Sequence, residues 1–272
     1  MTEERPQPPE AREHLVPLKA QVYKDPRPAA YFERFHARSR RRDPDAMYEI
    51  VRVVTSLVAW TVFRARGVGA ERVPASGPVI LAPNHFSNMD HFFFAAFIRR
   101  KVRFMAKSQL FRRPLQFVFS HGGVFPVRRG FQDEQAFITA GSILERGGCI
   151  AMYCEGGRSR TGRIGDRARP GIGRLALESG APVVPVAIHG SSHVRNWKRL
   201  RFPKVTVQYG EPFRFERVAA PARAQQQAAA DEIFAEIKAL YGRLDGDGRA
   251  ATLARARAER RERRAKRATA QA

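Results

Sequence analysis

The feature that most constrains the fold is an alternation of short apolar runs with helix-like segments, which begins at Gly77 and continues to Gly210. The runs are continuously apolar, a pattern typical of strands buried on both faces of a parallel sheet. The expected strands are PVILAPN, VRFMA, GVFPVRR, CIAMYC and PVVPVAI, with KVTVQYG as an edge strand. The helix-like segments between them are DHFFFAAFIRR, PLQFVFSH, residues 132–145 and GIGRLALESG. The sequence therefore predicts a single α/β domain with a mixed, largely parallel sheet flanked by helices.

The two ends of the chain differ in composition from this central region. At 272 residues and 43% hydrophobic content, the sequence is long enough for one substantial core. We expect residues 1–45 to form a polar, disordered arm without a signal peptide, residues 46–66 an amphipathic or membrane-interface helix, and residues 67–220 the core domain. Residues 221–272 are rich in Ala, Gln and Arg, which predicts a C-terminal helix and a basic tail.

The segment 46–66 is the most apolar candidate for contact with a membrane. Glu49 and Arg52 interrupt it, and the uninterrupted part is shorter than the roughly 20 residues that a membrane-spanning helix requires. Trp60 and the flanking arginines suit a helix that lies in the headgroup region. A helix that packs on one face of the sheet would have the same composition, and the sequence leaves both interpretations open.

The charge balance predicts an anionic partner. The 49 Lys and Arg residues against 26 Asp and Glu give a formal net charge of +23, which suits nucleic acid, phospholipid headgroups or a phosphorylated substrate. From Arg249 onward nine basic residues face two acidic ones, so we expect a solvated tail that is helical only on contact with an anionic surface. The two cysteines, Cys149 and Cys154, form neither a disulfide framework nor a zinc set, which fits a reducing cytoplasmic environment.

Polar groups gather where the predicted strands end, and ligands bind at such ends in open α/β sheets. In PNHFSNMD, His85 lies on the loop after the first strand. Ser87 is a good helix N-cap, and Asp90 lies in the first turn, from which its carboxylate can reach back to the imidazole. The same residues form an S-x-x-D capping box, so this turn alone leaves a catalytic pair and an ordinary cap open.

Three further strand ends carry polar or basic residues. GGVFPVRRG ends with Arg128 and Arg129, whose guanidinium groups can bind a phosphate or remain solvated. CIAMYCEGGRSRTG places Glu155, two glycines and Arg158 after a buried strand, where backbone N–H groups and side chains can hold an anion. APVVPVAIHGSS suggests the wall of a site more than a place of chemistry.

These four blocks, in this order, resemble those of the glycerophospholipid acyltransferases, whose best-known branch is 1-acylglycerol-3-phosphate acyltransferase. The match runs from Asn84 to Gly190 and comprises NHFSNMD, GVFPVRR, YCEGGRS and VVPVAI, with RFMAKSQLF as the connecting segment. Where the family's third block usually reads F-P-E-G-T-R, this chain has Tyr153, Cys154 and Gly157 in place of Phe, Pro and Thr. These departures put the choice of substrate in doubt more than the catalysis.

The resemblance implies roles for individual residues. His85 would be the general base, Asp90 would orient it, and Arg128 would hold the phosphate of the acceptor. On the acceptor side, the third block would contribute Glu155, Gly156 and Arg158. Neither a metal nor a bound cofactor is expected, because a histidine paired with a carboxylate is a sufficient base for a hydroxyl near neutral pH.

The implied reaction moves a fatty acyl group from an acyl-CoA or acyl-carrier-protein thioester to the free hydroxyl of 1-acylglycerol 3-phosphate, which gives phosphatidate. The enzyme would act as a peripheral protein at an anionic surface, on the cytoplasmic side of the cell membrane. The nearest alternative is another acceptor, either glycerol 3-phosphate or a different lysolipid. The alternative from another class is a basic nucleic-acid-binding protein without enzymatic activity, which would explain the tail but not the four strand ends.

Overall fold

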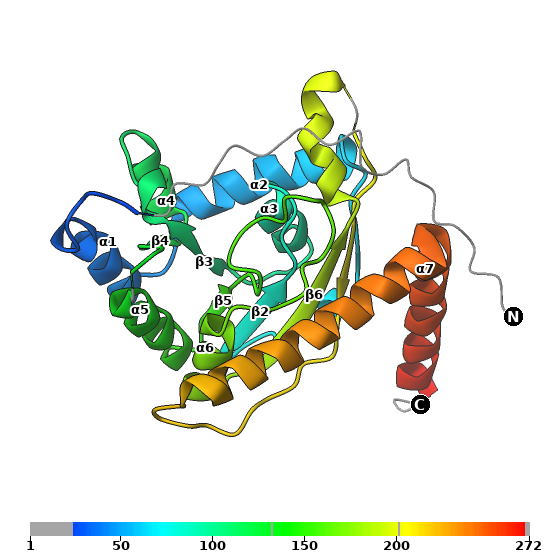
Figure 1. Ribbon diagram of the computed structural model, residues 1–272. Coiled ribbons are helices and arrows are strands. Elements are labelled where there is room, and N and C mark those ends of the chain that lie inside the picture. Colours follow the sequence, from blue (N-terminus) through cyan, green and yellow to red (C-terminus); the bar gives the residue numbers. More distant parts are fainter. Residues whose placement is uncertain (1–23, 132, 201, 270–272) are drawn as a thin grey trace, which may run out of the picture.

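A seven-stranded sheet runs through the centre of the computed structural model, which describes residues 24–131, 133–200 and 202–269 (Figure 1). The strands are β1 (Arg66–Val68), β2 (Val79–Pro83), β3 (Val102–Lys107), β4 (Val124–Val127), β5 (Cys149–Ala151), β6 (Val183–His189) and β7 (Thr206–Tyr209). The α-helices are α1 (Ala30–Arg41), α2 (Ala46–Thr61), α3 (Asp90–Ala95), α4 (Leu115–His121), α5 (Glu134–Glu145), α6 (Gly171–Ser179) and α7 (Arg223–Thr269). The 3-10 helices of the described residues are η2 (Ala70–Arg72), η3 (Ser108–Leu110) and η4 (Ser191–Arg199).

The sheet is mixed and largely parallel, as predicted. Its order is β1-β7-β6-β2-β5-β3-β4, and the five strands from β6 to β4 all run parallel. β7 pairs antiparallel with β6, and β1 pairs parallel with β7. The prediction that KVTVQYG forms an edge strand is wrong, because β1 occupies that edge. β1 was not predicted, because its three residues, Arg66–Val68, do not form an apolar run.

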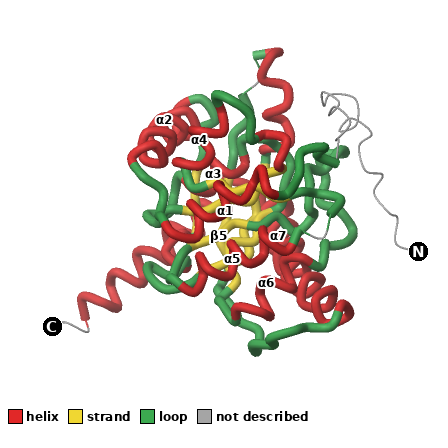
Figure 2. The backbone as a smooth tube through the Cα atoms, turned by 90° about the vertical axis from the view of Figure 1, so that its left-hand side faces the viewer, coloured by secondary structure: helices red, strands yellow, loops and turns green. Residues whose placement is uncertain are grey.

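Helices cover both faces of the sheet (Figure 2). The residues of β2 alternate between the faces, since Val79 and Leu81 pack with side chains of α2 and α3. Ile80 and Ala82 pack into a second cluster with side chains of α5, α6 and the first part of α7. Both faces being buried explains why these strands read as continuous apolar runs. The parallel arrangement also brings the carboxyl ends of β2, β3, β4, β5 and β6 to one edge of the sheet.

The prediction of a disordered arm is wrong for the part that the structure describes. α1 packs against α5 and β4, and its Phe32 and Phe35, three residues apart on one helix face, are buried with Phe111. Before the helix, the Asp25 carboxylate pairs with Arg27 at 2.7 Å. The high charge and proline content of the arm concealed this small apolar stripe. The part of the prediction on residues 1–23 lies outside the described residues.

α2 combines the two arrangements that the sequence left open. Tyr48, Ser56 and Ala59 are buried on the side facing the core, and the Tyr48 hydroxyl accepts a hydrogen bond from the Val102 N–H at 2.9 Å. Packing on the core is therefore confirmed. The opposite side exposes a row of large apolar side chains, Ile50, Val53, Val54, Leu57 and Trp60. Among the helices of the described residues, none combines the length and apolar character needed to cross a membrane.

The predicted solvated tail is wrong in its conformation, because α7 extends to Thr269. The helix is kinked at Gly248, whose φ of 73° lies in the left-handed region that favours glycine. Just after the kink, the Arg249 guanidinium donates to the carbonyl oxygens of Val205 and Arg64 and so anchors the second half of α7 to the end of the sheet. The first half of α7 is part of the core, where Ile233 and Phe234 are buried.

Candidate active site

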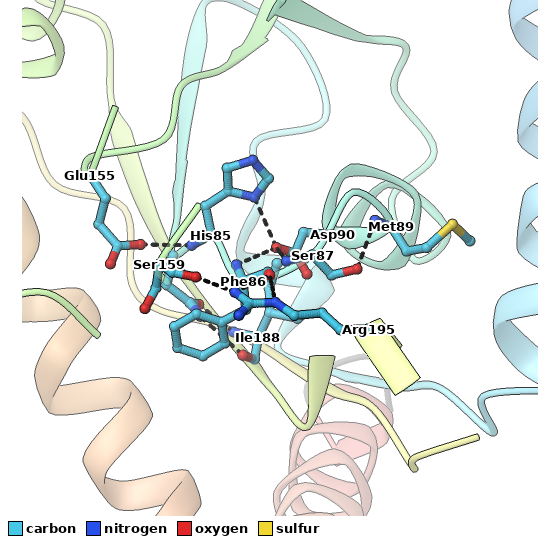
Figure 3. A network of polar contacts seen from close by, with 10 residues as sticks. His85, Phe86, Ser87, Met89, Asp90, Glu155, Ser159, Ile188 and Arg195 are labelled. Atoms are coloured by element: carbon cyan, nitrogen blue, oxygen red, sulfur yellow. Dashed lines mark hydrogen bonds and ion pairs between the residues drawn. The ribbon is translucent and has the colours of Figure 1, made fainter. Parts of the chain in front are cut away.

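The turn after β2 is fixed to the neighbouring strand by Asn84. Its side-chain amide donates to the Ile188 carbonyl oxygen at 3.1 Å and accepts from the Ile188 N–H at 2.7 Å, so both hydrogen-bonding groups of the β6 residue are satisfied. Asn84 is fully buried, and these two hydrogen bonds hold the next residue, His85, at the carboxyl end of the parallel strands. Figure 3 shows His85 in this position. The predicted location of His85 at a strand end is confirmed.

His85 and Asp90 lie together, as the sequence predicted. Nδ1 of His85 is 2.9 Å from Oδ2 of Asp90, and that same oxygen accepts hydrogen bonds from the N–H groups of Phe86 at 2.6 Å and Ser87 at 2.7 Å (Figure 3). The Ser87 hydroxyl oxygen in turn accepts from the Met89 N–H at 3.1 Å. The predicted N-cap position of Ser87 is not observed, because α3 begins at Asp90 and Met89 is its N-cap residue. One oxygen of the Asp90 carboxylate instead binds both the imidazole and the backbone of the turn. Since Asp90 accepts from Nδ1, the other ring nitrogen of a neutral imidazole is free to accept a proton.

The surroundings of His85 keep its imidazole neutral. Burial lowers the pKa of His85 below the 6.5 of a free histidine, and the nearby Arg158 and Arg129 lower it further, while Asp90 acts in the opposite direction. The ring also stacks on Tyr153, with ring centres 3.8 Å apart and planes inclined by 16°. A neutral, oriented imidazole is the form in which histidine acts as a base.

Glu155 does not line the site as the resemblance implied. Its Oε2 accepts from the His85 N–H at 2.9 Å, and its Oε1 accepts from the Gly165 N–H at 2.9 Å. Burial raises the pKa of this carboxyl, while the two backbone donors favour its ionised form. Glu155 therefore joins two loops beneath the site. Gly156 was also predicted to bind substrate, but its absent side chain is needed by the loop itself. Its φ of +66° favours glycine, and an added Cβ would lie 3.0 Å from the Arg169 side chain.

His85 opens into a cavity of about 420 Å³ with one basic and one apolar side. The basic side carries Lys107 from the end of β3, Arg129 from the end of β4, and Arg158. Burial lowers the pKa of Lys107, and Arg158 and Arg129 add to the effect, so three cationic groups act on one another across this wall. Their proximity suits a ligand with concentrated negative charge.

The prediction that Arg128 binds the phosphate is not supported by its position, because Arg129 lines the cavity in its place. The Arg128 guanidinium donates to the Arg27 carbonyl oxygen at 3.2 Å and lies over the Phe131 ring, while the backbone N–H of Arg128 donates to the Asp133 carboxylate. Neighbouring residues at the end of an extended strand point to opposite sides, so only one of two consecutive arginines can face the cavity. The sequence does not show which of the two it is. Arg158 does line the cavity, as predicted.

The apolar side of the cavity continues between α2, α3 and α4. A smaller cavity of about 120 Å³ shares part of its wall with the larger one and reaches Tyr48 and Ser56 of α2. The residues that line both cavities are His91, Phe92, Phe104, Phe119 and Val124. Sequence reasoning missed Lys107 and Tyr153 as site residues. The rule that ligands gather at strand ends would have found Lys107, which is the last residue of β3.

The comparisons with known proteins agree with this arrangement. A family model described as Acyltransferase matches residues 64–189. A glycerol-3-phosphate acyltransferase of Colwellia psychrerythraea is 34% identical over 108 residues, which are 36% of this chain and 13% of that protein. A chloroplastic 1-acyl-sn-glycerol-3-phosphate acyltransferase of Brassica napus, BAT2, is 25% identical over 149 residues, 53% of this chain and 43% of that protein. The chain thus spans less than half the length of these curated relatives.

Among solved structures, the 1-acyl-sn-glycerophosphate acyltransferase PlsC of Thermotoga maritima is similar, with a TM-score of 0.55 and 21% sequence identity. The similarity covers 78% of this chain and 88% of that one. At this level of identity, the likeness shows that the two proteins share a fold. Together with the family model, it confirms the resemblance that the four blocks indicated.

Proposed function

Residues 64–189 match the Acyltransferase family, and from that match we propose that the chain transfers a fatty acyl group from an acyl thioester to the free hydroxyl of 1-acylglycerol 3-phosphate. The observation that carries this proposal is the His85–Asp90 pair, whose histidine lines a cavity with a basic wall and an apolar wall. An acceptor of this kind combines a phosphate with an acyl chain and so matches both walls. The donor is a thioester of coenzyme A or acyl carrier protein.

In this mechanism His85 is the general base. The acceptor hydroxyl gives its proton to the free ring nitrogen as its oxygen attacks the thioester carbonyl carbon. The C–O bond forms, the C–S bond of the resulting tetrahedral intermediate breaks, and the departing thiolate takes the proton back from the imidazolium. Asp90 holds Nδ1 in place throughout and stabilises the imidazolium, with its charge supported by the N–H groups of Phe86 and Ser87.

Direct transfer is favoured over an acyl-enzyme intermediate by the state of the available nucleophiles. Cys154 is fully buried, and burial raises the pKa of its thiol far above the ordinary value, which suppresses the reactive thiolate. Ser87 is also buried, and its hydroxyl oxygen accepts from the Met89 N–H in the turn before α3. Neither group lines the cavity that contains His85. Trapping of an acylated Cys154 or Ser87 after rapid quenching would contradict direct transfer.

Lys107, Arg129 and Arg158 are the proposed ligands of the acceptor phosphate, because they form the basic wall beside His85. Glycerol 3-phosphate is the second candidate acceptor, since it has the same phosphate and is the substrate named for the Colwellia relative. The apolar extension beneath α2, α3 and α4 favours the acylated acceptor or the acyl chain of the donor. Comparing the two acceptors at equal concentration distinguishes these candidates.

We propose that the protein works on the cytoplasmic surface of the membrane as a peripheral protein. The exposed apolar row of α2 lies beside α4, which exposes Leu115 and Phe117. Leu110, in the adjoining 3-10 helix, is both partly exposed and part of the cavity wall. An amphiphilic substrate can therefore move from a lipid surface into the cavity without crossing a wide aqueous gap. Sedimentation with anionic liposomes at low and high salt tests this attachment.

The experiment that tests the function measures transfer of a labelled acyl group from acyl-CoA or acyl carrier protein to lysophosphatidate. Wild type, His85→Ala and a matched control, His193→Ala, are compared after their folding has been checked. His193 is exposed in η4 and does not line the cavity, so its variant retains activity. We expect product from wild type and the control and almost none from His85→Ala. Substantial activity in His85→Ala would overturn the mechanism, and an inactive, folded wild type with either donor and acceptor would overturn the function.

A further inference from the structure

Arg195 lies outside the four blocks, in η4, yet it contacts two of the loops that form the site (Figure 3). Its Nε and Nη2 donate to the Phe86 carbonyl oxygen at 3.1 and 2.8 Å, and its Nη1 donates to the Arg160 carbonyl oxygen at 3.0 Å. Nη2 also donates to the Ser159 carbonyl oxygen. Every nitrogen of the guanidinium is therefore engaged with a backbone carbonyl of the loop after β2 or the loop after β5.

These contacts close a cross-link between the two loops. The Ser159 N–H donates to the His85 carbonyl oxygen at 2.8 Å, so the two loops are also joined directly beside the base. Arg195 reinforces this junction from the other side through Phe86 and Ser159. A guanidinium fixes three carbonyl oxygens in one plane, which a flexible ammonium group cannot do. Since four of its five N–H donors are already used, Arg195 is poorly placed to bind the substrate's phosphate itself.

A single peptide group connects Arg195 to the His–Asp pair. The carbonyl oxygen of this peptide belongs to Phe86 and accepts from Arg195, and its N–H belongs to Ser87 and donates to Asp90 Oδ2 at 2.7 Å. That oxygen also accepts from Nδ1 of His85. A positive group on the carbonyl side of a peptide polarises it and strengthens the donation from its N–H side. The chain of contacts therefore runs from Arg195 through one peptide and Asp90 to His85.

We propose that Arg195 is a positioning residue for the proposed acyl transfer, which holds the His85 turn against the loop after β5 and strengthens the hydrogen bond that the Ser87 N–H donates to Asp90. The kinetic part of this proposal rests on the function proposed above. Its structural part concerns the His–Asp pair itself and is measurable without a substrate. The proposal assigns a role in the site to a residue that none of the four sequence blocks contains.

The test compares Arg195→Met, which removes the charge and the donors at similar length, with Arg195→Lys, which keeps the charge. Arg167→Met is the matched control, because Arg167 is exposed and is absent from the cavity wall. Hydrogen exchange of the Ser87 and Ser159 amides and an NMR titration of the His85 imidazole are measured on each protein. In Arg195→Met we expect faster exchange at both amides. We also expect a higher pKa for His85, because a cation and the support of the Asp90 charge are both lost.

The kinetic readout separates positioning from substrate binding. Displacing a catalytic group by about 1 Å costs on the order of 100-fold in rate, so we expect kcat of Arg195→Met to fall by about 10- to 100-fold while KM for the acceptor changes by less than about threefold. We expect the kcat of Arg195→Lys to lie between the values of Arg195→Met and wild type. A merely structural role would lower Tm in both variants but leave the His85 pKa unchanged.

Several results of these measurements would contradict the role proposed for Arg195. Unchanged amide exchange and an unchanged His85 pKa in folded Arg195→Met would overturn the proposal. A raised KM with unchanged kcat would also overturn it, because Arg195 would then act on substrate binding. If Arg195→Met does not fold, Arg195→Lys supplies the same three readouts, and wild-type values for all of them would overturn it. If the wild type transfers no acyl group, the proposed function fails, while the exchange and the titration still decide whether Arg195 positions the pair.

Discussion

The turn that carries His85 and the basic wall that faces it are built in different ways. In the turn, the carboxylates of Asp90 and Glu155 and the amide of Asn84 all hold backbone groups of the strand ends. In the wall, Lys107 and Arg158 line the cavity as long cationic side chains, and burial together with the charge of Arg158 lowers the pKa of Lys107. The part proposed for proton transfer is therefore positioned by backbone contacts, whereas the part proposed for binding consists of long cationic side chains that a bound anion would order.

The largest effect is expected where the turn's contacts converge, at Asp90. In Asp90→Asn the side chain keeps its size, and its one oxygen can take the place of Oδ2 as the acceptor for three donors, but the negative charge that stabilises the imidazolium is lost. The loss of this charge should lower kcat by up to roughly 10⁴-fold. Steady-state kinetics at saturating acceptor, with the fold checked by circular dichroism, measure this. A loss below tenfold would mean that the turn is not the rigid part of the site.

The next effect concerns the wall and uses two adjacent arginines as a matched pair. A charged hydrogen bond contributes about 1.5–3 kcal/mol, so Arg129→Met should raise KM for the acceptor by roughly 10- to 100-fold with a smaller change in kcat. Arg128→Met should change KM little, because the Arg128 guanidinium contacts the Arg27 carbonyl oxygen outside the cavity. Initial rates over a range of acceptor concentrations measure both variants. The opposite result, with Arg128→Met the weaker binder, would restore the residue that the sequence resemblance indicated.

This pair of arginines marks the limit of what the sequence could predict. The apolar runs and strand-end blocks predicted the parallel core, and they brought His85 and Asp90 together, because apolar runs and a five-residue spacing within one turn are local patterns. To predict that Arg129 and not Arg128 lines the cavity, one must know the direction in which each side chain points after β4. Two adjacent arginines have the same side chain, so the sequence does not give this direction. Arg195 carries no local signal at all. Its role arises from contacts with Phe86 and Ser159, which lie 109 and 36 residues away in the sequence.

The pH dependence of the reaction links the basic wall to the turn, because the cationic side chains of the wall lower the pKa of His85. His85 must be deprotonated to act as a base, so kcat/KM should be constant at higher pH and fall as the pH drops through the pKa of His85, at a midpoint below 6.5. Arg129→Met removes a cation that disfavours the imidazolium, so its midpoint should move to higher pH. Profiles of kcat/KM from pH 5 to 8 for both proteins measure the shift. A wild-type midpoint above 6.5 would contradict the neutral, buried state of His85.

The smallest effect is expected at Tyr153, whose ring and hydroxyl contribute differently. The ring stacks on His85 at 3.8 Å, whereas the hydroxyl is buried and has no hydrogen-bond partner among the described residues. Tyr153→Phe keeps the stacking and removes the unsatisfied group, so activity should stay within about twofold and the free energy of unfolding should stay the same or rise by about 1 kcal/mol. Tyr153→Leu removes the stacked ring and should lower kcat by roughly two- to tenfold.

Kinetics and urea unfolding of both Tyr153 variants complete the comparison between the turn and the wall. If Tyr153→Phe raises KM for donor or acceptor, then the hydroxyl contacts substrate, and the residue belongs to the binding wall. If Tyr153→Phe is neutral and Tyr153→Leu lowers kcat alone, then the ring belongs to the turn, because it acts only through the imidazole that it covers. The second result would make the turn a unit that holds His85 on three sides, by the Asp90 carboxylate, by the backbone contact to Ser159 and by an aromatic face.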